Sequence, residues 1–174
     1  PRSEFSQSLS GMFGSFYNNL LDAAPGDFDH DYDMIVSMGE VWSTVIVEAY
    51  LRMRGLNTKW CDIRKLLRTD DRHREAGIIW EDSRAAVTKA LTFNDADIYV
   101  TQGFIGATAG GEVTTLGREG SDYTAAVLAN MLDAREVVVW KDVPGIMNAD
   151  PDWMPAAVTL EHLSYNEAVE MSFS

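Results

Sequence analysis

Apolar side chains recur every three or four residues in several parts of the chain, a spacing that predicts amphipathic helices. Pro25-Gly26 and Gly55 would end the first two of these helices, since both are strong stop signals. Near the end of the chain, Ser164 and Glu167 have the Ser-x-x-Glu spacing of a capping box, which predicts a helix beginning at Ser164. The earlier helices are expected at residues 3–22, about 40–54, 81–92 and from Ser121 onward.

Short apolar runs between these helices predict β-strands. Gly110-Gly111 is typical of a hairpin turn before one of them. The run Val137-Val138-Val139-Trp140 has no polar alternation, which is typical of a parallel strand covered on both faces. The strands are expected at residues 34–37, 56–61, 98–101, 113–116 and 136–140. Strands alternating with helices favour an α/β fold.

The stretch from Thr114 to Asp142 reads as a loop, a helix and a buried strand, and it carries the densest candidate chemistry. Two glycines, Gly117 and Gly120, free the loop to approach a ligand closely. Open α/β sheets bind ligands beyond the carboxyl ends of their strands. The candidate residues at that edge are Arg118, Ser121 as helix cap, Asp122 at the positive end of the helix dipole, Lys141 and Asp142. The alternative is a capped helix with a charged, exposed loop.

Glu40 is predicted at a turn between the strand 34–37 and the following helix. There it would either complement the helix dipole or face the ligand crevice and hold an ammonium group. The acidic segment 27–33 is predicted to be a turn, and residues 69–74 a surface loop with His73 exposed.

Composition excludes several classes of function. The chain has 174 residues, 46% hydrophobic and 24% charged, which is typical of one globular domain. Its net charge of −13 disfavours nucleic acid and anionic membranes. Cys61 is the single cysteine, and nothing resembles a signal peptide or a long apolar span, so we expect a cytoplasmic protein. Helix patterns run up to both ends, so we expect a piece of a longer protein.

Four segments in order resemble the aspartate kinases of the amino-acid kinase family. They are VSMGE at 36–40, VTQGFIG at 100–106, the stretch 114–126 and the stretch 140–151. The likeness covers residues 33–174, with residues 1–32 as a helical lead-in, so we expect 1–174 to be a partial catalytic domain. The resemblance implies an αβα sandwich with a mostly parallel central sheet, incomplete at both ends.

The resemblance also implies an activity: transfer of the γ-phosphoryl group of ATP, with Mg²⁺, to the side-chain carboxylate of L-aspartate, the entry to lysine, threonine and methionine synthesis. By this likeness Glu40 grips the substrate ammonium group, Arg118 pairs with a substrate carboxylate, and Phe104 and Ser121 line the aspartate pocket. Asp122 is implied to be an active-site aspartate. The nucleotide-binding stretch would include Lys141, Asp142, Gly145 and Met147.

The sequence departs from the family in ways that affect the expected activity. The family's Lys-Phe-Gly-Gly-Thr-Ser loop, whose lysine stabilises the transferring phosphoryl group, has no counterpart here, so we expect little activity from this piece alone. The parent protein is expected to be a homo-oligomer. Two alternatives remain: a kinase of the same fold with glutamate, carbamate or a nucleoside monophosphate as acceptor, or a non-catalytic ligand-binding module.

Overall fold

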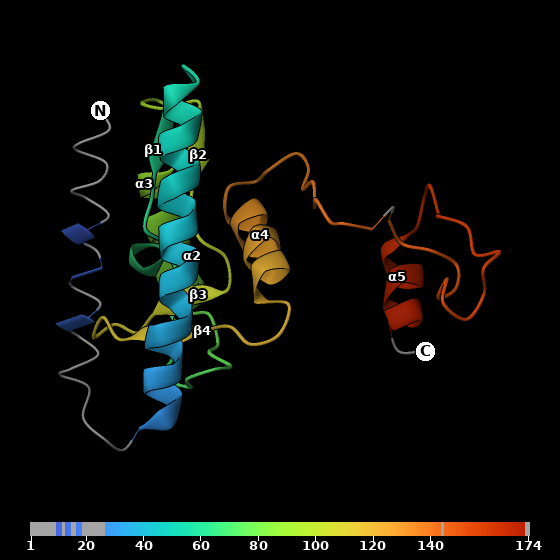
Figure 1. Ribbon diagram of the computed structural model, residues 1–174, viewed down its shortest axis with the longest axis horizontal. Helices are drawn as coiled ribbons and strands as arrows, with labels where there is room; N and C mark the ends of the chain where they lie inside the picture. Colours follow the sequence, from blue (N-terminus) through green and yellow to red (C-terminus); the bar gives the residue numbers. More distant parts are fainter. Residues whose placement is uncertain (1–9, 12, 15–16, 19–26, 144, 173–174) are drawn as a thin grey trace. The chain divides into compact units, whose positions relative to one another are not determined.

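The computed structural model describes residues 10–11, 13–14, 17–18, 27–143 and 145–172. It forms two compact units, residues 1–137 and 138–174. The described residues of the predicted helix 3–22 are all helical, and the rest of that helix lies outside the described residues. The elements in chain order are α2 (Phe28–Met53), β1 (Thr58–Trp60), the short 3-10 helix η1 (Ile63–Lys65), α3 (Trp80–Ala90), β2 (Ile98–Val100), β3 (Ile105–Ala107), β4 (Val113–Thr115), α4 (Gly120–Met131) and α5 (Tyr165–Ser172). Figure 1 labels the α-helices and the strands.

Helix α2 is continuous over 26 residues, so the predicted turn at 27–33 and strand at 34–37 are wrong. Asp27 caps the helix by accepting the amide of His30 at 3.2 Å, and the acidic residues that follow suit the positive end of the helix dipole. A short apolar run such as 34–36 fits a strand and a buried helix equally well, which explains the error. Glu40 therefore lies in the middle of a helix.

Helix α2 is also long and apolar enough to span a membrane by length and composition alone, so the expectation of no long apolar span fails here. The helix nevertheless packs against β1, β2 and β4 of its own unit. It also buries three polar residues completely or nearly so, namely Asp33, Ser37 and Thr44. These contacts place one face of α2 against the first unit, while large apolar side chains such as Ile46, Val47 and Tyr50 are exposed.

Two small sheets lie beside α2. Strands β1 and β2 are parallel, with Lys59 opposite Tyr99, and β3 and β4 form an antiparallel hairpin with Gly106 opposite Thr114. Gly111 turns the hairpin with a φ of +90°, a conformation that favours glycine. These strands confirm the predictions at 56–61, 98–101 and 113–116, and α3 confirms the helix predicted at 81–92.

Helices α3 and α4 pack on the core of the first unit, and a buried glutamine connects three of its segments by hydrogen bonds. The Gln102 side chain is 1% exposed; its Nε2 donates to Thr44 Oγ1 at 2.7 Å and its Oε1 accepts the amide of Ile63 at 2.8 Å. This bridge fixes the segment after β2 against α2 and η1. The buried apolar residues around it are Val41, Ile63, Leu66, Leu67, Val87, Leu91, Ile105, Val127 and Met131.

The strand predicted at 136–140 is wrong. Residues 136–140 are irregular, and the side chains of Val137 to Trp140 are 46–90% exposed. A strand buried on both faces needs neighbouring strands and covering helices. Within the residues that the structure describes, parallel pairing joins β1 with β2 and, in an isolated bridge, Arg68 with Ala107, and the segment 136–140 takes part in neither. This segment spans the boundary between the two units.

The second unit confirms the predicted capping box. The amide of Ser164 donates to Glu167 Oε2 at 2.8 Å, and the amide of Glu167 donates to Ser164 Oγ at 3.3 Å. Earlier in this unit, Met147 pairs with Thr159 in an isolated antiparallel bridge. Helix α5 thus begins where the sequence predicts.

Candidate active site

The first turn of α4 packs against the segment that follows β2 so closely that both sides need glycine. A Cβ atom on Gly103 would lie 2.7 Å from Ser121 Oγ, and one on Gly120 would lie 2.7 Å from the Cβ of Phe104. Phe104 itself has a φ of +51°, which is uncommon for a residue with a side chain. A hydrogen bond of 3.0 Å from the Phe104 amide to Thr124 Oγ1 holds the segment in place.

Glu40 reaches this junction from α2. Its Oε1 accepts the amide of Gly103 at 3.4 Å, a long hydrogen bond, and the side chain is half-buried. Gly103 is therefore the meeting point of Glu40, from α2, and Ser121, from α4. Although Glu40 lies in a helix and not at a strand end, its carboxylate still comes to the end of β2.

The start of α4 differs by one residue from the prediction. The helix begins at Gly120, and its N-cap is Glu119, which has a φ of +56° and makes no side-chain cap. The prediction that Ser121 caps the helix is therefore wrong; Ser121 lies inside the first turn, against Gly103. Asp122 is in the first turn as predicted and half-buried. Free amides of a helix N-terminus favour anions, so this turn suits a negatively charged ligand.

A cavity of about 810 Å³ opens between α2 and the loop that precedes α4. Phe104 and Arg118 both line it, with Tyr32 and Val36 of α2. Arg118 is exposed and has no ion pair with any residue the structure describes. Its guanidinium is thus available to a ligand carboxylate, for which its planar fork is well suited.

The two other arginines of this cavity are already paired. Arg72 Nε lies 2.9 Å from Asp70 Oδ2, and Arg74 Nη1 lies 3.1 Å from Asp29 Oδ1. The hydrogen bond to Asp29 raises the pKa of Arg74, which keeps this side chain charged. Each of these two arginines is therefore balanced by a carboxylate, which leaves Arg118 as the cavity arginine without an ion pair to a residue that the structure describes.

Asp33 is a residue of this region that the sequence did not reveal. It is fully buried and accepts hydrogen bonds from the amide and hydroxyl of Thr115 and from the amide of Arg74. His73 Nδ1 also lies 3.1 Å from Asp33 Oδ2, and its side chain is 13% exposed, so the prediction that His73 is exposed is wrong. Asp33 was not singled out because the segment 27–33 was predicted to be an exposed acidic turn. The signal that could have identified Asp33 is its position directly before the apolar residues 34–36.

The four predicted nucleotide-binding residues lie in the second unit. Lys141 and Asp142 are exposed, and Gly145 has a φ of +135°. Met147 belongs to the bridge with Thr159, beside the hydrogen bond from the Leu160 amide to the carbonyl oxygen of Ile146. Their role in binding a nucleotide stays a prediction.

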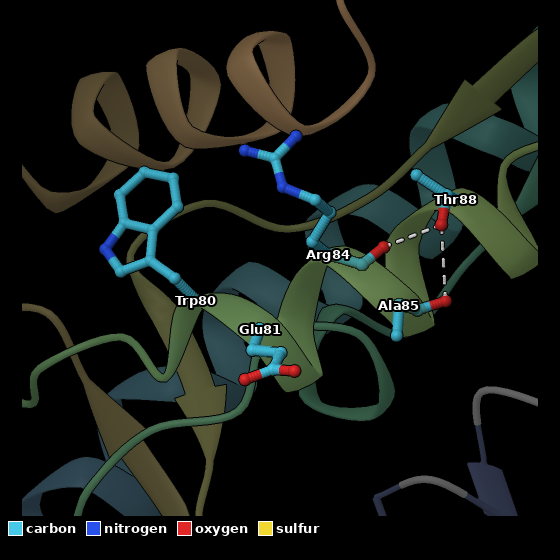
Figure 2. A pocket seen from close by; sticks show the side chains of 5 residues that line it. All are labelled: Trp80, Glu81, Arg84, Ala85 and Thr88. Carbon is cyan, nitrogen blue, oxygen red and sulfur yellow. Dashed lines mark hydrogen bonds between the residues drawn. The ribbon is translucent and has the colours of Figure 1, made fainter.

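A second cavity, of about 570 Å³, lies on α3 and contains none of the predicted site residues. Figure 2 shows Arg84 and Trp80 on its wall, with the Arg84 guanidinium directed toward α4. Arg84 donates to the carbonyl oxygen of Asn130 at 3.2 Å and to its Oδ1 at 2.7 Å. Because the last carbonyls of a helix need such donors, Arg84 has a structural role here.

Comparison with known proteins assigns the family. The model of the amino acid kinase family matches residues 8–174. Lysine-sensitive aspartokinase 3 of Escherichia coli is 43% identical over 141 residues, which are 80% of this chain and 31% of that protein. A bifunctional aspartokinase/homoserine dehydrogenase of Arabidopsis thaliana is 37% identical over 142 residues, 81% of this chain and 16% of its own length.

Solved structures give the same result. E. coli aspartokinase III in complex with aspartate and ADP superposes with a TM-score of 0.87 at 36% identity, covering 97% of this chain and 38% of that one. The complex of the same enzyme with lysine and aspartate gives a TM-score of 0.86 at 35% identity, covering 98% and 39%. The chain thus spans about a third of the length of the E. coli enzyme. This match confirms the predicted α/β fold, and the chain belongs to the amino acid kinase family.

Proposed function

We propose that this chain is part of an aspartate kinase, which transfers the γ-phosphoryl group of ATP to the side-chain carboxylate of L-aspartate and forms 4-phospho-L-aspartate. The observation that carries the proposal is the junction at Gly103, where Glu40 and Ser121 meet beside a cavity lined by Phe104 and Arg118. The relatives named above are aspartokinases, and one was crystallised with aspartate and ADP. The reaction would begin lysine, threonine and methionine synthesis.

The substrate has one cationic and two anionic groups, and the site offers a partner for each kind. The Glu40 carboxylate can hold the ammonium group, and Arg118 can pair with a carboxylate through two parallel hydrogen bonds. Phe104 supplies an apolar wall of the cavity. Because the reaction brings two anionic groups together, positioning and charge neutralisation are the main tasks of the protein.

In the transfer itself, an oxygen of the aspartate side-chain carboxylate forms a bond to the γ-phosphorus as the bond to the β-phosphate oxygen breaks, and ADP leaves. The first turn of α4, with Ser121 and Asp122, would face this reaction. Lys141, Asp142, Gly145 and Met147 would bind the nucleotide. Free amides of the α4 N-terminus would contribute positive potential to the phosphates.

Mg²⁺ would arrive with ATP and neutralise charge between the phosphates. Among the described residues no three ligating side chains gather into a metal site. Mg²⁺ bound mainly by phosphates and water needs only one or two carboxylates. Asp122 keeps the proposed role of an active-site carboxylate at the start of α4.

The remaining properties are proposed from charge and composition. At a net charge of −13, binding to nucleic acid or to an anionic membrane is disfavoured, and we propose a cytoplasmic enzyme. We also propose that the whole protein is a homo-oligomer, which sedimentation of the full-length enzyme would test.

The direct test is a hydroxamate assay of the full-length enzyme with ATP and Mg²⁺. Aspartate should give acyl phosphate, while glutamate, carbamate and nucleoside monophosphates should give none above background. A parallel calorimetric titration of the chain with aspartate, and separately with ATP–Mg²⁺, tests binding without turnover. Preference for another acceptor, or binding of aspartate without any turnover in the full-length enzyme, would replace this proposal with one of the two alternatives.

A further inference from the structure

Asp33 is a buried carboxylate that the proposed reaction does not use directly. It is 0% exposed, and both of its oxygens are occupied. Oδ1 accepts the hydroxyl of Thr115 at 2.6 Å, and Oδ2 accepts the amides of Thr115 at 3.0 Å and of Arg74 at 2.9 Å. A buried charge is costly unless it is fully hydrogen-bonded, so this arrangement strongly fixes the groups that contact it.

Two short paths lead from Asp33 to Arg118. The first runs along the chain, since Thr115 ends β4 and only Leu116 and Gly117 separate it from Arg118. The second runs through space. Asp33 holds the Arg74 amide, and the carbonyl oxygen of Arg74 lies so close to Gly117 that a Cβ there would be 3.2 Å away. Arg118 thus follows a segment clamped on two sides.

Two of these clamped residues have a positive φ, which glycine adopts freely but a residue with a side chain does not. Arg74 has a φ of +69° and Gly117 a φ of +81°, both in the left-handed region. For Arg74, which has a side chain, this conformation is uncommon and persists only when surrounding contacts impose it. The hydrogen bond from the Arg74 amide to Asp33 is such a contact, so removal of the Asp33 charge should let the segment relax.

We propose that Asp33 is a positioning residue that holds the segment before α4 so that Arg118 faces the cavity. This inference rests on the proposed function, because it assigns to Asp33 a share in binding the carboxylate of aspartate through Arg118. Asp33 lies on the same helix as Glu40, two helical turns earlier. Helix α2 would therefore bind the substrate twice: directly through Glu40 and indirectly through Asp33.

The test is a double-mutant cycle in the full-length enzyme, with Asp33→Asn, Arg118→Ala and the double variant. Asparagine retains the size of the side chain and one acceptor oxygen but removes the charge. Asp33→Asn should raise the KM for aspartate roughly tenfold, the size expected for weakened hydrogen bonds to a charged group. The KM for ATP should stay within about twofold, and in the Arg118→Ala background Asp33→Asn should raise the aspartate KM no further.

Two further variants keep this test informative. Asp31→Asn, on the same helix but half-buried and paired with His30, should leave both KM values unchanged. If Asp33→Asn does not fold, Thr115→Val removes one hydroxyl donor to Asp33 and should show the same dependence on Arg118 with a smaller effect.

The outcomes separate this inference from the proposed function. Equal increases of the aspartate KM in both Arg118 backgrounds, or equal increases of the KM for aspartate and for ATP, would show that Asp33 acts on general stability, and the inference would be wrong. Both comparisons of KM values require a wild-type enzyme that phosphorylates aspartate. A wild type that does not phosphorylate aspartate would overturn the proposed function, and this inference with it.

Discussion

The close packing of the loop after β2 against the start of α4 predicts that a side chain at Gly103 would reduce both stability and activity. Its backbone is so close to α4 that an added Cβ would lie 2.7 Å from the Oγ, 2.9 Å from the Cβ and 3.0 Å from the Cα of Ser121. An ordinary contact needs about 3.5 Å, so in Gly103→Ala the loop and the helix must separate by roughly 0.8 Å at the closest atom. The nearby Cα means that a rotation of the Ser121 side chain cannot relieve the clash.

The separation should affect both stability and activity. Overpacking of this kind costs roughly 1–3 kcal/mol of unfolding free energy. The loop also carries the Gly103 amide that contacts Glu40 and the ring of Phe104, so the two sides of the proposed aspartate site would move apart. A displacement near 1 Å of positioning groups can cost about 10²-fold in rate.

The assay is the aspartate-dependent hydroxamate reaction, with urea unfolding as the measure of stability. Gly103→Ala should lose most of its kcat/KM for aspartate and unfold at lower urea concentration. The matched control is Gly110→Ala in the β3–β4 hairpin, where the nearest atom to an added Cβ is 3.6 Å away, and it should behave as wild type. A Gly103→Ala enzyme with normal stability and normal kcat/KM would refute the close packing and the site built on it.

Three other predictions follow from the described contacts. Arg118→Ala should raise the KM for aspartate at least tenfold, and Arg118→Lys should recover only part of it because a lysine cannot bind in the bidentate manner; steady-state kinetics measures both. Burial by itself would raise the pKa of Asp70, but hydrogen bonds from the Gly77 amide and a nearby arginine lower it. A lowered pKa in the folded state stabilises the fold above the ordinary value of 3.8, and this contribution is lost as the pH falls through the folded-state pKa. Urea unfolding of Asp70→Asn should therefore depend less on pH between about pH 5 and 2 than that of wild type. Finally, Ser164→Ala removes half of the capping box with Glu167 and should speed amide hydrogen exchange in the first turn of α5; an unchanged exchange rate would contradict the cap.

Local signals in the sequence located most elements but not their extent. The hairpin at Gly110-Gly111 and the capping box at Ser164 were predictable because each depends on residues within a few positions of one another. The strand at 34–37 and the strand at 136–140 were predicted wrongly from short apolar runs. Such runs do not report whether a neighbouring strand exists, and that is a property of the rest of the fold.

In the candidate site, too, the residues could be identified from local motifs, but their arrangement in space could not. Glu40, Phe104 and Ser121 were identified from their motifs, yet their convergence on Gly103 depends on contacts across 63 and 18 positions of the sequence. Asp33 was missed because its partners lie 40 to 82 positions away.

The error in secondary structure around Glu40 did not displace its carboxylate from the site, and the reason is geometric. Helix α2 runs beside β1 and β2, so a side chain in its middle reaches the segment that leaves β2. The helix adds something that a turn would not: a rigid connection between Glu40, at the proposed ammonium site, and Asp33, at the clamp before Arg118. Because residues of one helix move together, any shift of α2 would change both ends of the aspartate site at once.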